Sequence, residues 1–162
     1  MRVYLPSTLP GLRRLLDGDG LGPLPLPAFA VTGALREWYA EGDDEELEYA
    51  ALGLAARASV RLVEHDDAPP RRVVVVAEVE HVEPAPEVDR AAVRVGQDVP
   101  LRLVQAVFVD DPAAEGDVRT AAEHLVAADL GSEEAAFSVE QAEGHELQWY
   151  ATQEIGPLLE LS

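Results

Sequence analysis

The feature that most constrains the fold is a run of four consecutive valines, residues 73–76, inside the segment RRVVVVAEV at 71–79. β-Branched side chains favour an extended backbone. Successive side chains of a strand point to opposite faces of its sheet, so adjacent valines bury both faces at once. The run therefore predicts a strand at 71–79 that lies inside a sheet covered on both sides, as in an α/β or α+β fold.

A long helix is predicted at about 43–64, shortly before this strand. Its apolar residues recur at helical spacing along one face: Leu47, Ala50, Ala51, Leu54, Ala55, Ala58 and Leu62. The acidic residues at 43–46 would lie at its N-terminal end, where the helix dipole favours negative charge. A helix of this length with one apolar face is expected to pack on the sheet.

The remaining elements follow from shorter patterns and cap residues. Further strands are predicted at residues 2–5, 28–31, 92–95, 104–109 and 147–151. Helices or helical turns are predicted after Ser7, Thr32, Asp111, Ser132 and Thr152, with capping-box spacing at 138–141. The expected whole is one domain, residues 1–162, with a five- to six-stranded mixed sheet and about five helices.

Residue usage excludes several kinds of chemistry. The 162 residues include no cysteine, which excludes disulfides, thiol nucleophiles and cysteine metal ligands. No apolar run approaches the roughly 20 residues that span a bilayer, and residues 1–6 lack a signal-peptide layout. All 12 basic residues are arginine, while lysine and asparagine are missing. Both missing residues have A/T-rich codons, which indicates a GC-rich genome. The expected location is the cytoplasm.

The net charge of −19 bears on the choice of partner. It opposes binding to phosphate backbones and anionic lipid headgroups, so neither a nucleic acid nor a membrane is expected as a partner. It favours solubility and a basic or cationic protein partner. The charge is also uneven, because no basic residue follows Arg119 whereas nine acidic residues do. The oligomeric state is left open.

Two short acidic segments hold most of the large aromatic rings. The first aromatic segment, residues 36–49, and the second aromatic segment, residues 143–154, provide the candidate binding residues Trp38, Tyr39, Tyr49, Trp149 and Tyr150. An aromatic side chain buries on the order of 150–250 Å², so exposed loops would not keep these rings in water. We therefore expect the two segments to meet in the fold, with a histidine of the second segment at the rim.

The candidate catalytic residues are His145, Glu146, Glu45 and Glu48. A loop histidine beside carboxylates can act as a base or a metal ligand, and Glu45 and Glu48 share a face of the predicted helix. The same residues also fit a hydrogen-bonded turn and a solvated helix end. No histidine has a partner at metal-ligand spacing, so no metal site and no cofactor are expected.

The glycines at 18, 20 and 22 resemble a nucleotide loop only superficially. They follow a predicted helix, whereas a phosphate-binding loop must precede one. The same stretch lacks a calcium site, because Ala28 stands where the bidentate glutamate of such a loop would be. These glycines are expected to form a turn.

Three stretches of the chain resemble an uncharacterised family of small actinobacterial proteins. They are REWYAEG at 36–42, EELEYAA at 45–51 and EGHELQWY at 143–150, and the opening MRVYLP at 1–6 is similar too. The resemblance covers nearly the whole chain. It implies a cytosolic actinobacterial protein, consistent with the codon bias, and it carries no activity, ligand or catalytic residue.

Two classes of function fit these patterns, and the sequence leaves the function itself unknown. The first is a non-enzymatic interaction or regulatory module that binds a protein partner through its aromatic and acidic surface. The alternative is an enzyme with a carboxylate/histidine site, such as a metal-dependent hydrolase, or a small-molecule binder. A closed pocket with converging side chains would favour the enzyme, and an exposed aromatic surface would favour the interaction module.

Overall fold

The four valines lie in strand β3 (Val73–Glu78), which pairs with β1 (Arg2–Ser7) on one side and β6 (Val104–Val109) on the other. In the computed structural model, which describes residues 1–162, none of the four is more than 5% exposed. The predicted interior strand is therefore confirmed, and its burial on both faces places it within the layered core.

The sheet has seven strands in the order β4-β5-β2-β1-β3-β6-β7, and every neighbouring pair is antiparallel. The prediction of a mixed sheet with five to six strands is wrong in both respects. Strand β4 has only three residues, VEP, and its polar side chain and proline give no strand signal. The other strands are β2 (Leu26–Phe29), β4 (Val82–Pro84), β5 (Ala92–Val95) and β7 (Gln148–Ala151).

The position of β1 explains why no pair is parallel. Strands β2 and β3 are connected through helices and run in the same direction, as a crossover connection allows. They do not pair with each other, because β1 lies between them and is antiparallel to both. Because the N-terminal strand β1 separates these two parallel strands, all neighbouring strands at this point of the sheet are antiparallel.

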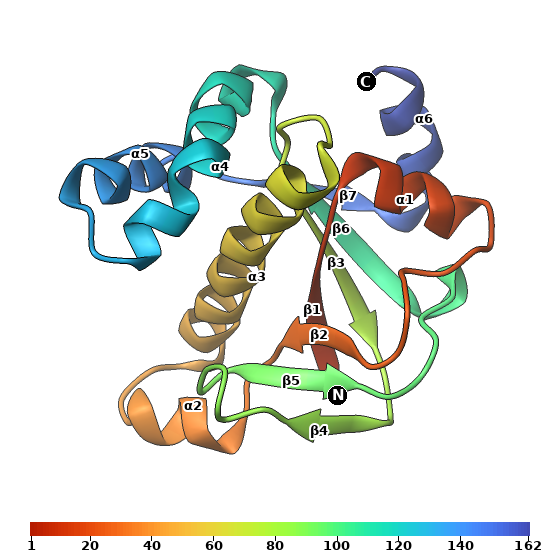
Figure 1. Cartoon of the computed structure of the whole chain (residues 1–162). Coiled ribbons are helices and arrows are strands. Elements are labelled where there is room, and N and C mark those ends of the chain that lie inside the picture. The colour runs from red at the N-terminus through yellow and green to blue at the C-terminus, as the bar shows by residue number, and fades with distance from the viewer.

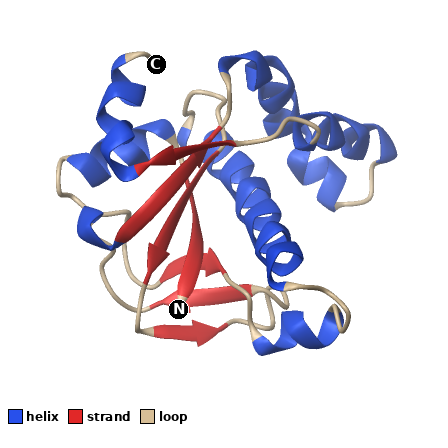
Figure 2. Ribbon diagram, turned by 180° about the vertical axis from the view of Figure 1, so that it is seen from behind, coloured by secondary structure: helices blue, strands red, loops and turns tan.

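Six α-helices and three 3₁₀ turns surround the sheet (Figures 1 and 2). Helix α3 covers one face, where it packs on Val74 and Val76, while α1 and α6 cover the other face over Val73 and Val75. Helices α4 and α5 form a hairpin against the C-terminal half of α3. The helices are α1 (Leu9–Leu16), α2 (Gly33–Trp38), α3 (Asp44–Asp66), α4 (Glu115–Asp129), α5 (Glu133–Glu143) and α6 (Ile155–Glu160). The 3₁₀ turns are Leu101–Leu103, Pro112–Ala114 and Thr152–Glu154.

The predicted face of α3 approaches the sheet through small side chains. Ala51 and Ala55 are fully buried, and their size lets the helix backbone lie close to the strands. Val60 and Val63, which the predicted stripe does not contain, contact the α4–α5 hairpin instead. Helix α3 therefore has two contact surfaces and connects the sheet to that hairpin.

Cap residues account for most helix starts, with four corrections. Thr152 is the first residue of the 3₁₀ turn Thr152–Glu154 rather than its cap, because the cap position is Ala151. Thr32 and Ser132 cap α2 and α5 as predicted. The cap of α1 is Thr8 rather than Ser7, because β1 continues through Ser7. Residues 138–141 lie inside α5 and start no helix. Asp111 does cap a turn, but that turn is 3₁₀ and α4 begins after it.

The glycine-rich turn between α1 and β2 is confirmed. Gly18, Gly20 and Gly22 all have positive φ values, a backbone region that side chains strongly disfavour. None of the helices has both the length and the apolar composition needed to cross a bilayer.

Candidate functional site

A groove of about 880 Å³ runs along helix α3. It reaches both sides of the helix, because Leu52 and Leu54 both line it and point about 200° apart around the helix axis. Its lining extends from Glu45 to Arg57, which are 12 residues, or about 18 Å, apart along the axis. We call the part near Glu45 the α2 end and the part near Arg57 the His145 end.

Aromatic rings stand exposed at the α2 end of the groove. Trp38 ends helix α2 and is 61% exposed, and Tyr49 on α3 is 69% exposed. Tyr39, the residue after Trp38, is exposed as well and also lines the groove. The guanidinium of Arg90 lies 3.6 Å from the centre of the Trp38 ring, within cation–π distance. Thr32 holds this arrangement, because its hydroxyl donates to the Arg90 carbonyl while it accepts from the first turn of α2.

Carboxylates lie beside these rings. Glu45 and Glu48 share a side of α3 and both line the groove, as their spacing predicts. Glu48 forms an ion pair of 3.2 Å with Arg2 of β1. Burial raises the pKa of the nearby Tyr4 hydroxyl, and the charge of Glu48 raises it further, while Arg2 acts in the opposite direction. The Tyr4 hydroxyl therefore stays protonated at neutral pH.

The second aromatic segment divides between the groove and other surfaces. His145 and Glu146 line the groove, but Trp149 and Tyr150 do not. Trp149 pairs with Phe108 on the α3 side of the sheet and is 58% exposed. Tyr150 is the next residue of strand β7 and packs on the opposite face with α1 and α6. The two aromatic segments do meet, because both line the groove and His145 is among the lining residues. The expected burial of their rings against each other is wrong, because the rings of Trp38, Tyr49 and Trp149 all remain exposed.

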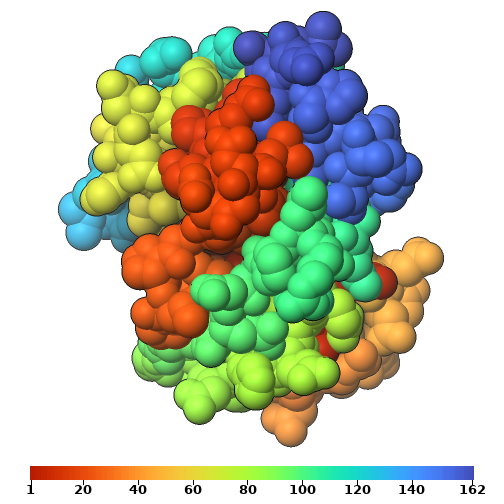
Figure 3. All heavy atoms as spheres, turned by 90° about the vertical axis from the view of Figure 1, so that its right-hand side faces the viewer, coloured from red at the N-terminus to blue at the C-terminus, as the bar shows by residue number.

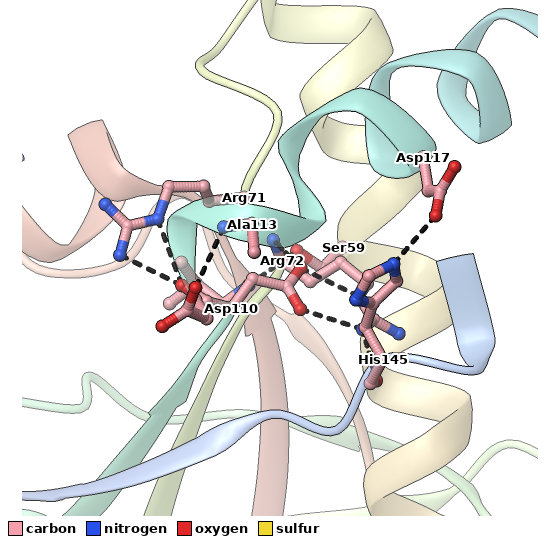
Figure 4. A network of polar contacts seen from close by, with 9 residues as sticks. Ser59, Arg71, Arg72, Asp110, Ala113, Asp117 and His145 are labelled. Atoms are coloured by element: carbon pink, nitrogen blue, oxygen red, sulfur yellow. Dashed lines mark hydrogen bonds and ion pairs between the residues drawn. The ribbon is translucent and has the colours of Figure 1, made fainter. Parts of the chain in front are cut away.

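A buried ion pair fixes the His145 end of the groove (Figure 4). Arg72 precedes β3 and donates twice to the carboxylate of Asp110 through Nε and Nη2, both at 2.8 Å. The backbone N–H of Arg72 donates to the same carboxylate. Nη2 of Arg72 also donates to the His145 carbonyl at 2.7 Å. The strand ends of β3 and β6 thereby hold the loop that carries His145.

His145 itself pairs with a carboxylate of α4. Its Nε2 lies 2.7 Å from Oδ2 of Asp117, and the ring is about one-third exposed (Figure 4). A carboxylate at one ring nitrogen orients the imidazole and leaves the other nitrogen to act as a proton acceptor. Asp117, Arg72 and Asp110 were not predicted from the sequence. Only the Asp-Asp-Pro sequence at 110–112 carries a local signal, and that signal indicates a helix start.

The four candidate catalytic residues line the same groove but not the same part of it. Glu48 lies nine residues before Arg57 on α3, roughly 13 Å along the axis. Arg57 in turn pairs with Glu143, two residues before His145. Glu45 and Glu48 thus lie at the α2 end, away from His145 and Glu146. No group of three His, Asp or Glu side chains is arranged to hold a metal ion.

Comparison with known proteins identifies the family to which the chain belongs. Residues 1–159 match the model of a family of unknown function, DUF6912. The chain belongs to this family. The match covers all seven strands and the site residues named above, which agrees with the resemblance across nearly the whole sequence. No curated protein and no solved structure matches the chain.

Proposed function

We propose that this member of DUF6912 is a non-enzymatic binding module whose groove takes a basic segment of a partner protein. The observation that carries the proposal is the α2 end of the groove, where exposed aromatic rings stand beside carboxylates. Exposed aromatic surface that persists in a folded chain is typical of interaction sites. A segment rich in arginine or lysine could stack its cations on the rings and pair with the carboxylates.

Most of the unpaired charges in the groove are negative. Of the three arginines that line it, Arg57 pairs with two carboxylates and Arg72 with Asp110, while Arg90 lies over the Trp38 ring and forms no ion pair. Glu45 and Glu146 also line the groove and form no ion pair. An arriving cation would therefore meet uncompensated carboxylates, in a chain whose net charge of −19 attracts it from a distance.

The contact between Arg90 and Trp38 supports the mode of binding. It shows that the Trp38 ring accepts a guanidinium at 3.6 Å on one face, while 61% of the residue stays exposed. The same ring chemistry is open to an arginine of a partner. Cation–π contacts contribute roughly 0.5–1 kcal/mol at exposed sites, so several contacts along the groove would be needed for specific binding.

The test is an affinity pull-down with the full chain from a native lysate at two salt concentrations. A partner held by this groove is retained at about 0.15 M salt and released at about 1 M, because the Debye length falls from about 8 Å to about 3 Å. The double variant Trp38→Ser with Tyr49→Ser removes the two most exposed of the three rings at the α2 end and leaves Tyr39 in place. We expect it to lose the partner at the lower salt concentration.

A matched variant controls for general loss of exposed aromatic surface. Trp149→Ser with Phe137→Ser also removes two exposed rings, and neither residue lines the groove. We expect this variant to retain the partner. Loss of the partner from both double variants, or retention at high salt, would contradict the proposal. The result would also separate the predicted binding residues into those that act and those that do not.

The pair of His145 and Asp117 favours an enzyme as the second candidate. An oriented imidazole at the edge of a groove can act as a general base. This candidate predicts hydrolysis of at least one member of a panel of nitrophenyl esters and phosphates, with loss of that activity in His145→Gln. An inactive panel, or equal activity in His145→Gln, would leave the binding module as the better explanation.

We also infer an actinobacterial origin and a cytosolic location. The support is the family-like segments together with the absence of lysine and asparagine, which indicates a GC-rich genome. Fractionation of the source cell, followed by detection of the chain with an antibody, would test the location.

A further inference from the structure

Arg71 is a buried cation without an acidic partner. It is 5% exposed, and it forms no ion pair although the chain has 31 acidic residues. Its Nε and Nη2 donate to the backbone carbonyl of Asp110, and its Nη1 donates to the hydroxyl of Ser162. Both acceptor atoms are neutral, and the Asp110 carbonyl oxygen accepts two of the three hydrogen bonds. A guanidinium has five N–H groups, so two of them remain free.

The neighbouring charges do not neutralise Arg71. The carboxylate of Asp110 is fully buried and receives its hydrogen bonds from Arg72. Arg71 and Arg72 point to opposite sides of the chain, as Figure 4 shows. Arg71, Arg72 and Asp110 together carry a net positive charge. The carboxylate of the next residue, Asp111, accepts from Ala113 and Gln148 and forms no ion pair with Arg71. A buried charge without a counter-ion is costly, which favours an anion at this point.

Arg71 borders a second, shallower depression of about 490 Å³, which is lined by residues of α1 and of the C-terminal end and shares no residue with the groove. Figure 3 shows the face on which α1 and the C-terminal residues lie side by side. The depression has apolar side chains around its two arginines, Arg71 and Arg13: Leu9, Pro10, Pro69, Pro112, Leu159 and Leu161. Arg13 is exposed at the end of α1 and forms no ion pair. Small-molecule sites typically measure 300–1,000 Å³ and combine apolar walls with a few polar groups.

We propose that this depression binds a small organic carboxylate with an apolar body. The carboxylate would receive the free N–H groups of Arg71 and pair with Arg13, in the geometry that guanidinium groups favour. The apolar body would cover the leucine and proline side chains. The exposed Glu115 also lines the depression, bonded to neither arginine, and it weakens the binding of an anion by repulsion. The site is separate from the groove and does not depend on the function proposed for it.

Calorimetric titration of the full chain with sodium octanoate tests the proposal. We expect saturable binding, no comparable binding of octan-1-ol, which lacks the charge, and weaker binding of inorganic phosphate, which lacks the apolar body. Arg13→Ala should weaken octanoate binding about tenfold, the ratio that corresponds to about 1.4 kcal/mol. Glu115→Gln should strengthen it several-fold.

Arg14→Ala is the matched control, because Arg14 is the next residue of α1, is also exposed and does not line the depression. It should leave octanoate binding unchanged, as should the double variant of Trp38 and Tyr49. Absence of saturable octanoate binding would overturn the proposal, and so would equal effects of Arg13→Ala and Arg14→Ala. Octan-1-ol or phosphate binding as tightly as octanoate would reduce the site to a purely apolar or purely anionic one and would also overturn it.

Discussion

At the scale of single residues, the side chains with the largest energetic consequences are those of Arg72 and Asp110. Their ion pair lies within the protein, where removal of one partner leaves the other charge buried and unpaired. Asp110 also receives the backbone N–H of Arg72, so this one carboxylate joins the ends of β3 and β6. The same pair holds the loop of His145 through the Arg72 guanidinium.

We predict that Asp110→Ala lowers the free energy of unfolding by about 3–5 kcal/mol. The reason is that Arg72 would keep its charge in a buried place without a counter-ion. Urea unfolding followed by circular dichroism measures the effect. Asp98→Ala is the control, because Asp98 is exposed and unpaired, and it should change the free energy by less than about 0.5 kcal/mol. Equal losses of unfolding free energy in the two variants would show that the buried pair contributes no more to stability than an exposed carboxylate does.

At the scale of elements, helix α3 connects the parts of the molecule, because it contacts the sheet and the α4–α5 hairpin and also lines the groove. The hairpin is held against α3 by ion pairs at the surface in addition to its apolar contacts. Arg57 pairs with Asp129 at the end of α4 and with Glu143 at the end of α5, and Arg61 pairs with Asp129 as well. These ion pairs hold the hairpin next to the His145 end of the groove.

The ion pairs of Asp129 predict a pH dependence. The hydrogen bond from Arg57, together with that from Arg61, holds the pKa of Asp129 below its usual value of 3.8. Because the pKa is lower in the folded state, the contribution to stability is present above pH 3.8 and is lost as the pH falls through the lowered pKa. The side chain is 38% exposed, so solvent screening keeps the contribution below about 1 kcal/mol.

Asp129→Asn therefore should destabilise the chain slightly at pH 7, and the difference from the parent should vanish as the pH falls below the lowered pKa. Urea unfolding at a series of pH values from 7 downward measures this difference. Asp19→Asn replaces an exposed, unpaired aspartate and should show no such trend. A difference that grows toward low pH would have the wrong sign and would contradict the assignment.

At the scale of the whole molecule, charge is the property that selects partners. Several arginines already make contacts within the protein. Arg72 pairs with Asp110, Arg57 and Arg61 pair with the helix hairpin, and Arg90 lies over the Trp38 ring. The net charge of −19 already counts these arginines, and it makes the field of the molecule negative over long distances.

We accordingly predict that the protein does not bind duplex DNA at physiological salt. Binding to a phosphate backbone requires several lysine or arginine contacts, and its affinity falls steeply with salt. A gel shift at about 0.15 M salt should show no complex, and dilution to about 0.05 M should not produce one. A complex of sub-micromolar affinity would show that the local placement of arginines outweighs the net charge.

Local sequence signals determined much of the secondary structure. The strands at 92–95 and 104–109 lie within their predicted bounds, and Thr32 and Ser132 cap helices as expected. The valine run correctly predicted one strand inside the sheet. Consecutive residues of a strand face opposite sides, so four apolar residues in a row indicate burial on both faces. Each of these features depends on neighbours in the chain, so the chain itself specifies it.

Pairing between distant segments was decided only by the tertiary structure. The antiparallel sheet depends on the insertion of β1 between β2 and β3, which no local pattern indicates. The groove gathers Glu45, Glu48, His145 and Glu146 along one helix but separates them by its length. Because successive side chains of β7 point to opposite faces of the sheet, Trp149 and Tyr150 do not contact the same cluster although they are neighbours in the sequence. Composition determined the net charge, but only packing determined which charges remain without a partner, because burial and pairing depend on contacts between residues far apart in the chain.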